Sequence, residues 1–366
     1  MEANRLVLNA LINLIPIAVS RLYFFMTRIE SQELKGVAIL LMLFLHLFNH
    51  EQEAIHCSNY FYINGTPLVH LMTRMANPVP FFVVLSGYGL YASYKKGDKN
   101  RWSRLLKLLS HYWLVLIVFV TIGHFIHPSI YPGGWTKMLE NLTGFYTTYN
   151  GEHWFLFPYL LLAITSPWLF KLCDKMNVTL VLVGAYILYL GTCFLISRYG
   201  ELYLYTNMWV YHPILYGSLL FDFILGAIAC KQGWLKNKMS FQITKWSWLL
   251  LVGLCVLRCC FTTGAFHNLY VFAFIMIWLQ TTRAQWVNHL LAHLGKHSMN
   301  IWFIHSFFCY YLFHDWIYGF KYPLLIYLVL IIVSYLSSLV IDLLYSFISR
   351  LFLFKNTNRH ILHQSQ

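Results

Sequence analysis

Residues 33–50, ELKGVAILLMLFLHLFNH, place a lysine at one end of an apolar run and two histidines at the other. Lys35 and His46 are eleven residues apart, so on a helix they lie on one face, separated by about 16 Å of rise. His50, four residues further on, is expected to continue the same stripe. An imidazole can act as a general base or as a nucleophile near neutral pH. The spacing alone leaves a plainer interpretation open, in which the histidine only packs and the lysine only anchors the helix end.

Other polar residues stand beside later apolar runs. Arg101 and Arg104 lie among several lysines, and this density of cations could hold a polyanion or simply orient a membrane chain. Glu152 could orient an imidazole, bind a sugar or help to move a proton, and Trp154 could stack on a sugar ring. The plainer interpretation of these two residues is a loop acid and an interfacial aromatic.

Ser298 and His305 share a late apolar run and are candidate pore-lining groups. Histidines four residues apart occur in this region and near His46, a spacing that brings two imidazoles to one helix face. Because no HExxH motif or cysteine set accompanies them, we expect no metal.

The elements that must position these residues are membrane helices. The chain has 366 residues, of which 59% are hydrophobic and only 11% charged, whereas soluble domains contain about 25% charged residues. The net charge of +13 does not indicate nucleic-acid binding, because the cations fall between apolar runs and form no basic face. The composition predicts an all-α polytopic membrane protein in the lipid bilayer.

Apolar runs of spanning length predict about ten transmembrane helices in one bundle. They lie near residues 34–50, 78–94, 105–126, 153–172, 178–197, 209–230, 246–263, 266–282, 298–314 and 323–347. With the start of the first span inside, the inner segments hold 19 of the 26 Lys and Arg residues and the outer segments hold 4. The positive-inside rule therefore puts the Lys35 end and the C-terminus in the cytoplasm. Residues 1–28 are expected to be an interfacial helix or sequence upstream of the true start, and residues 351–366 a cytoplasmic tail.

Several stretches, in order along the chain, resemble the acyltransferase family 3 membrane proteins. KGVAILLMLFLH is similar to that family's first span, in which an arginine, ten residues and a histidine are the hallmark. The other matching stretches are FFVVLSGYGLYASY (81–94), RWSR (101–104), EHWFLFPYLLL (152–162) and LGKHSMNIWFIH (294–305). The resemblance covers about residues 30–350 and makes 29–350 the membrane domain. Here the hallmark cation is Lys35, which keeps the charge but lacks the bidentate fork of arginine.

The resemblance implies an integral inner-membrane O-acyltransferase that moves acetyl from cytoplasmic acetyl-CoA to a hydroxyl of a cell-surface or exported glycan. His46 and Glu152 are then the expected catalytic residues, with His46 as base or as acyl relay. Lys35, Arg101 and Arg104 are expected to bind the acyl-CoA. Trp154, Ser298 and His305 are expected to contact the glycan acceptor.

Three alternatives remain at this stage. A transporter or flippase that exports a glycan or a lipid-linked intermediate would use similar polar residues to line its path. An acyltransferase with a lipid, antibiotic or peptide acceptor would keep the donor site. A catalytically inactive relative would keep only the fold.

Overall fold

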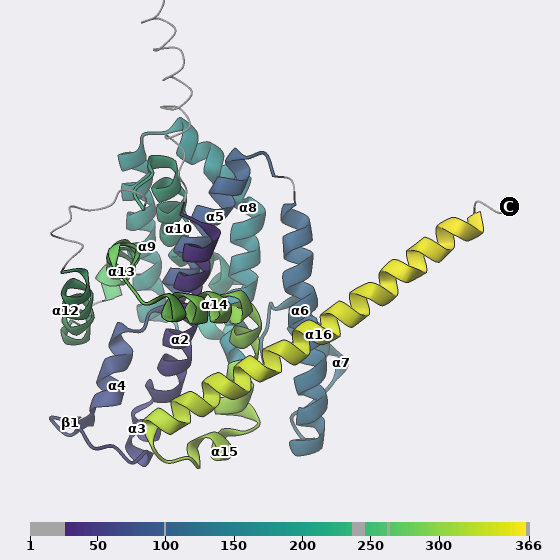
Figure 1. Ribbon diagram of the computed structural model, residues 1–366, viewed down its shortest axis with the longest axis horizontal. Coiled ribbons are helices and arrows are strands. Elements are labelled where there is room, and N and C mark those ends of the chain that lie inside the picture. Colours follow the sequence, from purple (N-terminus) through teal and green to yellow (C-terminus); the bar gives the residue numbers. More distant parts are fainter. Residues whose placement is uncertain (1–25, 99, 236–245, 262–263, 364–366) are drawn as a thin grey trace, which may run out of the picture.

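The computed structural model describes residues 26–98, 100–235, 246–261 and 264–363, which form a bundle of helices (Figure 1). The leader expected over residues 1–28 lies outside these ranges except for its last three residues. Four of the expected inner cations, Lys99, Lys236, Lys238 and Lys245, also lie outside them.

The apolar runs fold into helices close to the expected positions. The long helices are α2 (Arg28–Phe48), α5 (Pro78–Lys95), α6 (Arg101–Ile126), α8 (Leu156–Lys175), α9 (Val178–Tyr199), α10 (Met208–Gln232), α12 (Ser247–Cys260), α13 (His267–Gln280), α14 (Gln285–Ser306) and α16 (Pro323–His363). Within the described residues, seven segments are long and apolar enough to cross a membrane: 28–48, 68–95, 101–126, 151–175, 178–199, 208–232 and 323–351. The chain is therefore a multi-pass, all-α membrane protein.

The expected count of about ten spans is not confirmed. α12 and α13 have 14 residues each, so each rises only about 21 Å, less than the roughly 30 Å of a hydrocarbon core. α14 begins at Gln285, well before the expected start at residue 298, and its early turns carry His289 and His293. These polar residues keep α14 from being a uniformly apolar span.

The first long helix starts and stops at defined residues. Thr27 caps α2 by accepting a hydrogen bond from the Glu30 backbone N–H, and the Glu30 carboxylate accepts one from the Thr27 N–H, which is a capping box. α2 ends at Phe48 with Asn49 as its C-cap. His50 therefore lies outside the helix, and the expectation that it continues the Lys35–His46 stripe is wrong.

Glycines allow the central helices to touch backbone to backbone. A Cβ added at Gly36 of α2 would overlap the Leu291 carbonyl of α14, and one added at Gly295 would overlap the Gln32 carbonyl. Small residues permit such close approach between membrane helices. Because α2 and α14 are locked together in this way, their polar residues are held at fixed separations.

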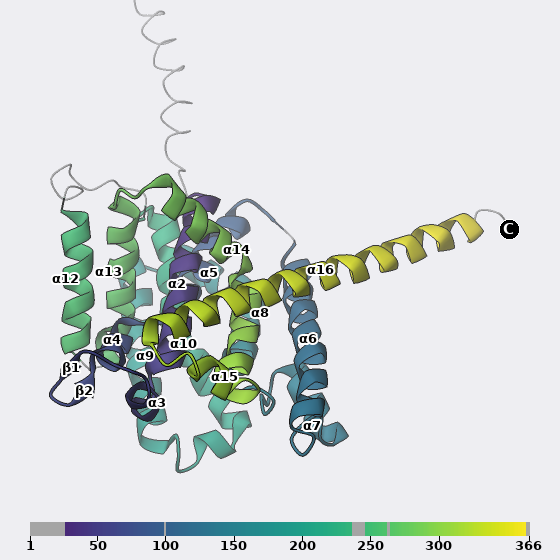
Figure 2. The same ribbon diagram turned by 60° about the horizontal axis from the view of Figure 1, so that its bottom comes forward.

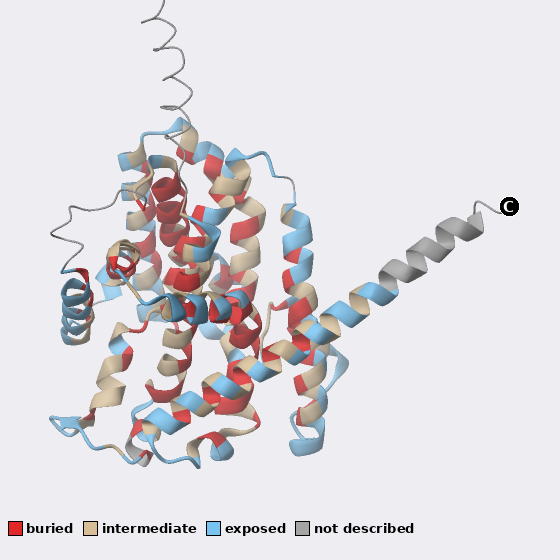
Figure 3. Ribbon diagram, viewed as in Figure 1, coloured by how far each residue is buried: buried red, intermediate tan, exposed pale blue. Residues whose placement is uncertain are grey.

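The long helices differ in how far they are buried and in how they cross the bundle. α10 is the most enclosed span, whereas α9 and α16 are largely exposed at the surface (Figure 3). α16 runs obliquely across the bundle and away from it, without a break at residue 351, where a separate tail was expected (Figure 2).

Shorter elements connect these helices. They are α3 (Glu51–His56), β1 (Tyr62–Ile63), β2 (Thr66–Pro67), α4 (Leu68–Met72), η1 (Thr73–Met75), α7 (Trp135–Thr143), η2 (Gly151–Phe155), η3 (Leu204–Thr206), η4 (Gly264–Phe266), the π-helix η5 (Phe307–Tyr311) and α15 (His314–Tyr318).

Candidate active site

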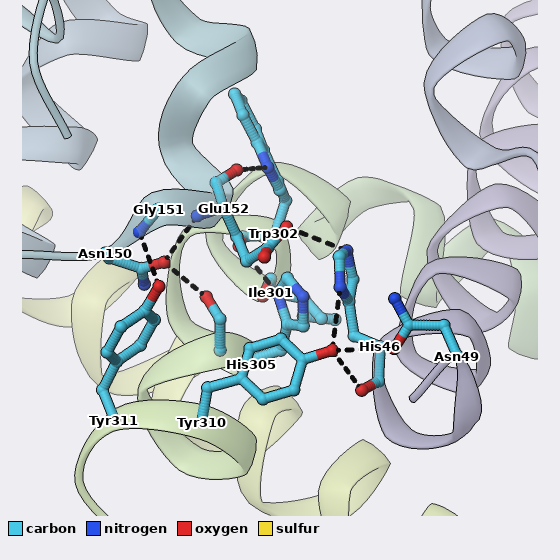
Figure 4. A network of polar contacts seen from close by, with 11 residues as sticks. His46, Asn49, Asn150, Gly151, Glu152, Ile301, Trp302, His305, Tyr310 and Tyr311 are labelled. Atoms are coloured by element: carbon cyan, nitrogen blue, oxygen red, sulfur yellow. Dashed lines mark hydrogen bonds and ion pairs between the residues drawn. The ribbon is translucent and has the colours of Figure 1, made fainter. Parts of the chain in front are cut away.

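Three titratable side chains from three separate elements meet at the end of α2 (Figure 4). His46 Nε2 lies 3.4 Å from Glu152 Oε2, and the His46 and His305 rings are 5.0 Å apart between centroids. His46 and Glu152 keep 14% and 23% of their side-chain surface exposed, whereas His305 is fully buried. The fold thus brings together a partly accessible imidazole, a carboxylate and a second imidazole.

Glu152 is held in place through its own backbone. Asn150 is fully buried, and its side-chain oxygen accepts hydrogen bonds from the Glu152 N–H (3.1 Å) and from the Ser306 hydroxyl (2.9 Å). The Trp302 indole N–H donates to the Glu152 carbonyl at 3.3 Å. Asn150 is a favoured N-cap residue type, and here it caps η2 and ties it to the end of α14.

His305 presents an unused acceptor. Its Nδ1 lies 2.8 Å from the Trp302 carbonyl and 3.2 Å from the Ile301 carbonyl. Because carbonyls only accept, Nδ1 must carry the hydrogen, and Nε2 then holds a lone pair. This Nε2 is buried and has no hydrogen-bond partner among the described residues. Buried polar atoms are rarely left unpaired, so this nitrogen suits a hydroxyl group brought by a ligand.

Lys35 lines a cavity beside Gly295 of α14, and His46 packs against His305 of α14, so both lie on the α2 face toward α14, as their spacing predicted. The cavity has a volume of about 330 Å³ and is also lined by three further cations, Arg28, Lys107 and Lys296. None of these four cations forms an ion pair within the described part of the chain. The cavity's carboxylate, Asp342, is already engaged, because it accepts from Asn300 Nδ2 (3.0 Å) and lies 2.9 Å from His297 Nδ1.

Arg101 and Arg104 lie elsewhere. They line a different cavity of about 370 Å³, which shares no lining residue with the Lys35 cavity. Arg104 forms an ion pair with Asp98, and neighbouring Lys95 forms one with Asp174 at 2.9 Å. The cations expected to act together are therefore divided between two places, and part of the second group is neutralised.

Two expected substrate-binding residues do not join the His46 cluster. Ser298 is buried and donates to the Gly295 carbonyl of its own helix at 2.9 Å. Trp154 packs half-buried against the core, with its ring 5.9 Å from Phe155. Within the described ranges, no hydrogen bond or ring contact links either residue to His46.

The structure adds residues that the sequence did not single out. His153 follows Glu152 in the chain, and its Nε2 lies 2.9 Å from the Phe303 carbonyl, so it connects η2 to α14. Tyr311 of η5 accepts a hydrogen bond from the Gly151 N–H at 2.8 Å, and Tyr310 contacts His46. Asn150 was not singled out either, although the preference for Asn at N-cap positions was a sequence signal for it.

Comparison with known proteins gives one match. The family model described as an acyltransferase domain matches residues 33–343, which is most of the chain and contains every residue of the His46 cluster. No curated protein and no solved structure matches the chain.

Proposed function

The chain belongs to this acyltransferase family, and from that premise we propose that it transfers acetyl from acetyl-CoA to a hydroxyl of a cell-surface or exported glycan. The observation that carries the proposal is the contact of His46 with Glu152, together with the cations that surround Lys35 on the same face of α2. The cationic cavity lies toward the start of α2, and the imidazole–carboxylate pair lies at its end. This arrangement suits an anionic donor whose reactive group lies far from its phosphates.

The distances support coenzyme A as the donor. About twelve bonds join the pyrophosphate of coenzyme A to its thioester sulfur, and an extended chain covers roughly 3.5 Å for every three bonds, or about 14 Å in all. Lys35 and His46 are about 16 Å apart along α2. The length of the donor therefore matches the spacing between the Lys35 cavity and His46, which supports coenzyme A.

The transfer step needs a base and a place for the charge that forms. His46 takes the proton of the acceptor hydroxyl while the hydroxyl oxygen attacks the thioester carbonyl. The C–S bond breaks as the new C–O bond forms, and the proton passes from His46 to the leaving thiolate. Glu152, 3.4 Å from His46, stabilises the transient imidazolium.

The acceptor is placed beside His305. Its unpaired Nε2 accepts a hydrogen bond from a second hydroxyl of a sugar, which orients the hydroxyl that reacts. A polyhydroxylated acceptor fits this arrangement better than a lipid or a peptide because it offers two neighbouring hydroxyl groups. We place the enzyme in the bacterial inner membrane, with the Lys35 cavity on the cytoplasmic side and His46 toward the outside.

The proposal is tested on surface glycan. O-acetyl content is measured by NMR before and after mild alkali in cells with no protein, wild type, His46→Ala or His212→Ala at matched membrane levels. His212 is the control because it is buried and bonded to a backbone carbonyl, that of Phe145, at 2.7 Å, outside the cluster. Acetate with wild type and His212→Ala, but not with His46→Ala, is the expected result. Acetate that is equal in all three would refute the role of His46, and reduced glycan export without any acetate would support a transporter.

A further inference from the structure

We infer that Tyr310 is a positioning residue that holds His46 in one tautomer, with hydrogen on Nδ1, so that Nε2 is the nitrogen that reacts. This inference rests on the proposed function and concerns a residue that comes from the π-helix η5 (Phe307–Tyr311). π-helical turns inside or beside α-helices occur often at functional sites, because the extra residue redirects side chains. Here η5 directs Tyr310 to the end of α2 and Tyr311 to the Gly151 N–H next to Glu152 (Figure 4).

The Tyr310 hydroxyl lies among three possible partners. It contacts the His46 carbonyl oxygen, lies 3.2 Å from Asn49 Oδ1, and lies 3.3 Å from His46 Nδ1. The Tyr310 and His46 rings also pack edge to face, 5.8 Å apart between centroids. Tyr310 therefore touches both the backbone and the imidazole of the proposed base.

The hydrogen count decides the tautomer. A tyrosine hydroxyl has one hydrogen to donate, whereas the His46 carbonyl and Asn49 Oδ1 are both acceptors. The hydroxyl lies closest to the His46 carbonyl and donates its one hydrogen there, so the tyrosine oxygen is left as an acceptor toward His46 Nδ1. The contact is then satisfied by a hydrogen on Nδ1, and a neutral imidazole with hydrogen on Nδ1 carries its lone pair on Nε2.

The lone pair on Nε2 faces the rest of the site. Nε2 is the His46 atom that lies 3.4 Å from Glu152, and the His305 ring adjoins it on another side. When Nε2 takes the proton of the acceptor hydroxyl, the imidazolium has the Tyr310 oxygen at one nitrogen and the Glu152 carboxylate at the other. The charged form thus has an oxygen acceptor near each nitrogen, at 3.3 Å and 3.4 Å.

The chain provides a matched control for a purely structural role. Tyr318 of α15 also donates its hydroxyl to a carbonyl at the end of α2, that of Leu47, at 2.8 Å. Within the described residues, it makes no hydrogen bond or ring contact with the His46 imidazole. Tyr310→Phe and Tyr318→Phe each remove one hydroxyl and one bond to the α2 backbone, but only the first removes the partner of Nδ1.

The experiment measures acetyl transfer by purified full-length protein in lipid nanodiscs, with acetyl-CoA as donor and isolated glycan as acceptor. Loss of a hydrogen bond to a group that becomes charged is expected to lower the kcat of Tyr310→Phe about 10- to 100-fold, with the KM for acetyl-CoA changed less than about twofold. Tyr318→Phe is expected to keep kcat within about threefold of wild type. Equal losses of kcat in both variants would show a backbone role alone and overturn the inference.

The outcomes for the inference and for the proposed function are distinct. A strong loss in His46→Ala with full activity in Tyr310→Phe would leave the proposed function standing and remove the role of Tyr310. A wild type that transfers no acetyl would overturn both. If Tyr310→Phe does not fold, as judged by its melting temperature, 2,3-difluorotyrosine at position 310 keeps the hydroxyl and weakens its oxygen as an acceptor. An unchanged kcat in that protein would equally refute the inference.

Discussion

The Lys35 cavity offers the sharpest quantitative test of the donor site. Replacing Lys35 with Gln removes one of the four cations that line it, Arg28, Lys35, Lys107 and Lys296. A unit charge 4 Å from a phosphate contributes about 4 kcal/mol at an effective dielectric constant of 20 and about 1 kcal/mol in bulk water. A cavity that opens to water lies between these limits, at about 2 kcal/mol, which corresponds to an approximately 30-fold weaker affinity for acetyl-CoA.

The assay is calorimetric titration of the purified protein with coenzyme A, with the KM for acetyl-CoA measured alongside. Lys35→Gln is expected to raise the dissociation constant by this factor, and Lys35→Arg is expected to restore most of the affinity because the charge remains. Lys171→Gln is the control, since Lys171 is an exposed lysine of α8 and lines neither the Lys35 nor the Arg101–Arg104 cavity. Raising the salt concentration should reduce the difference in coenzyme A affinity between wild type and Lys35→Gln, because mobile ions screen the charge of Lys35.

Arg104→Gln separates the two possible phosphate sites. Arg104 is already paired with Asp98 and lines the other cavity, so its replacement is expected to change coenzyme A affinity less than about threefold. If Lys35→Gln keeps its affinity for coenzyme A and Arg104→Gln loses most of it, the donor site proposed here is refuted. The phosphates would then bind in the Arg101–Arg104 cavity.

Three further predictions concern catalysis and folding. Glu152→Gln removes the charge that faces the imidazolium and should lower kcat about 100-fold in the nanodisc assay with little change in KM; an unchanged kcat would contradict this role. Gly295→Val should force α2 and α14 apart and lower the melting temperature, whereas Gly253→Val, where an added Cβ meets open space, should not; equal melting temperatures would contradict the close packing. Glu33→Gln leaves the largely buried Arg283 guanidinium without its charged partner at 2.9 Å and should lower the free energy of unfolding by about 3 kcal/mol, measured by denaturant titration; a loss below about 1 kcal/mol would show that the pair is dispensable.

The sequence predicted those features that depend on local pattern. The apolar runs predicted an all-α membrane protein because each span must satisfy its own backbone hydrogen bonds, whatever its neighbours are. The eleven-residue spacing of Lys35 and His46 predicted their shared face because helical periodicity is a local property. The ordered stretches predicted the family, which the match over residues 33–343 confirms. His50 was misplaced because the helix ends two residues before it, at Phe48.

Only the tertiary structure decided which side chains meet. Glu152, His305 and Tyr310 reach His46 from more than 100 residues away, and no periodicity links elements so distant in the chain. The separation of Lys35 from Arg104 depends in the same way on how α2, α5, α6 and α14 pack. The number of spans could not be fixed either, because polar side chains of α14 pair with another helix, as His293 does with Tyr335 and His297 with Asp342. The sequence by itself determined the kind of protein and one face of its reactive helix, whereas long-range packing determined the composition of the site.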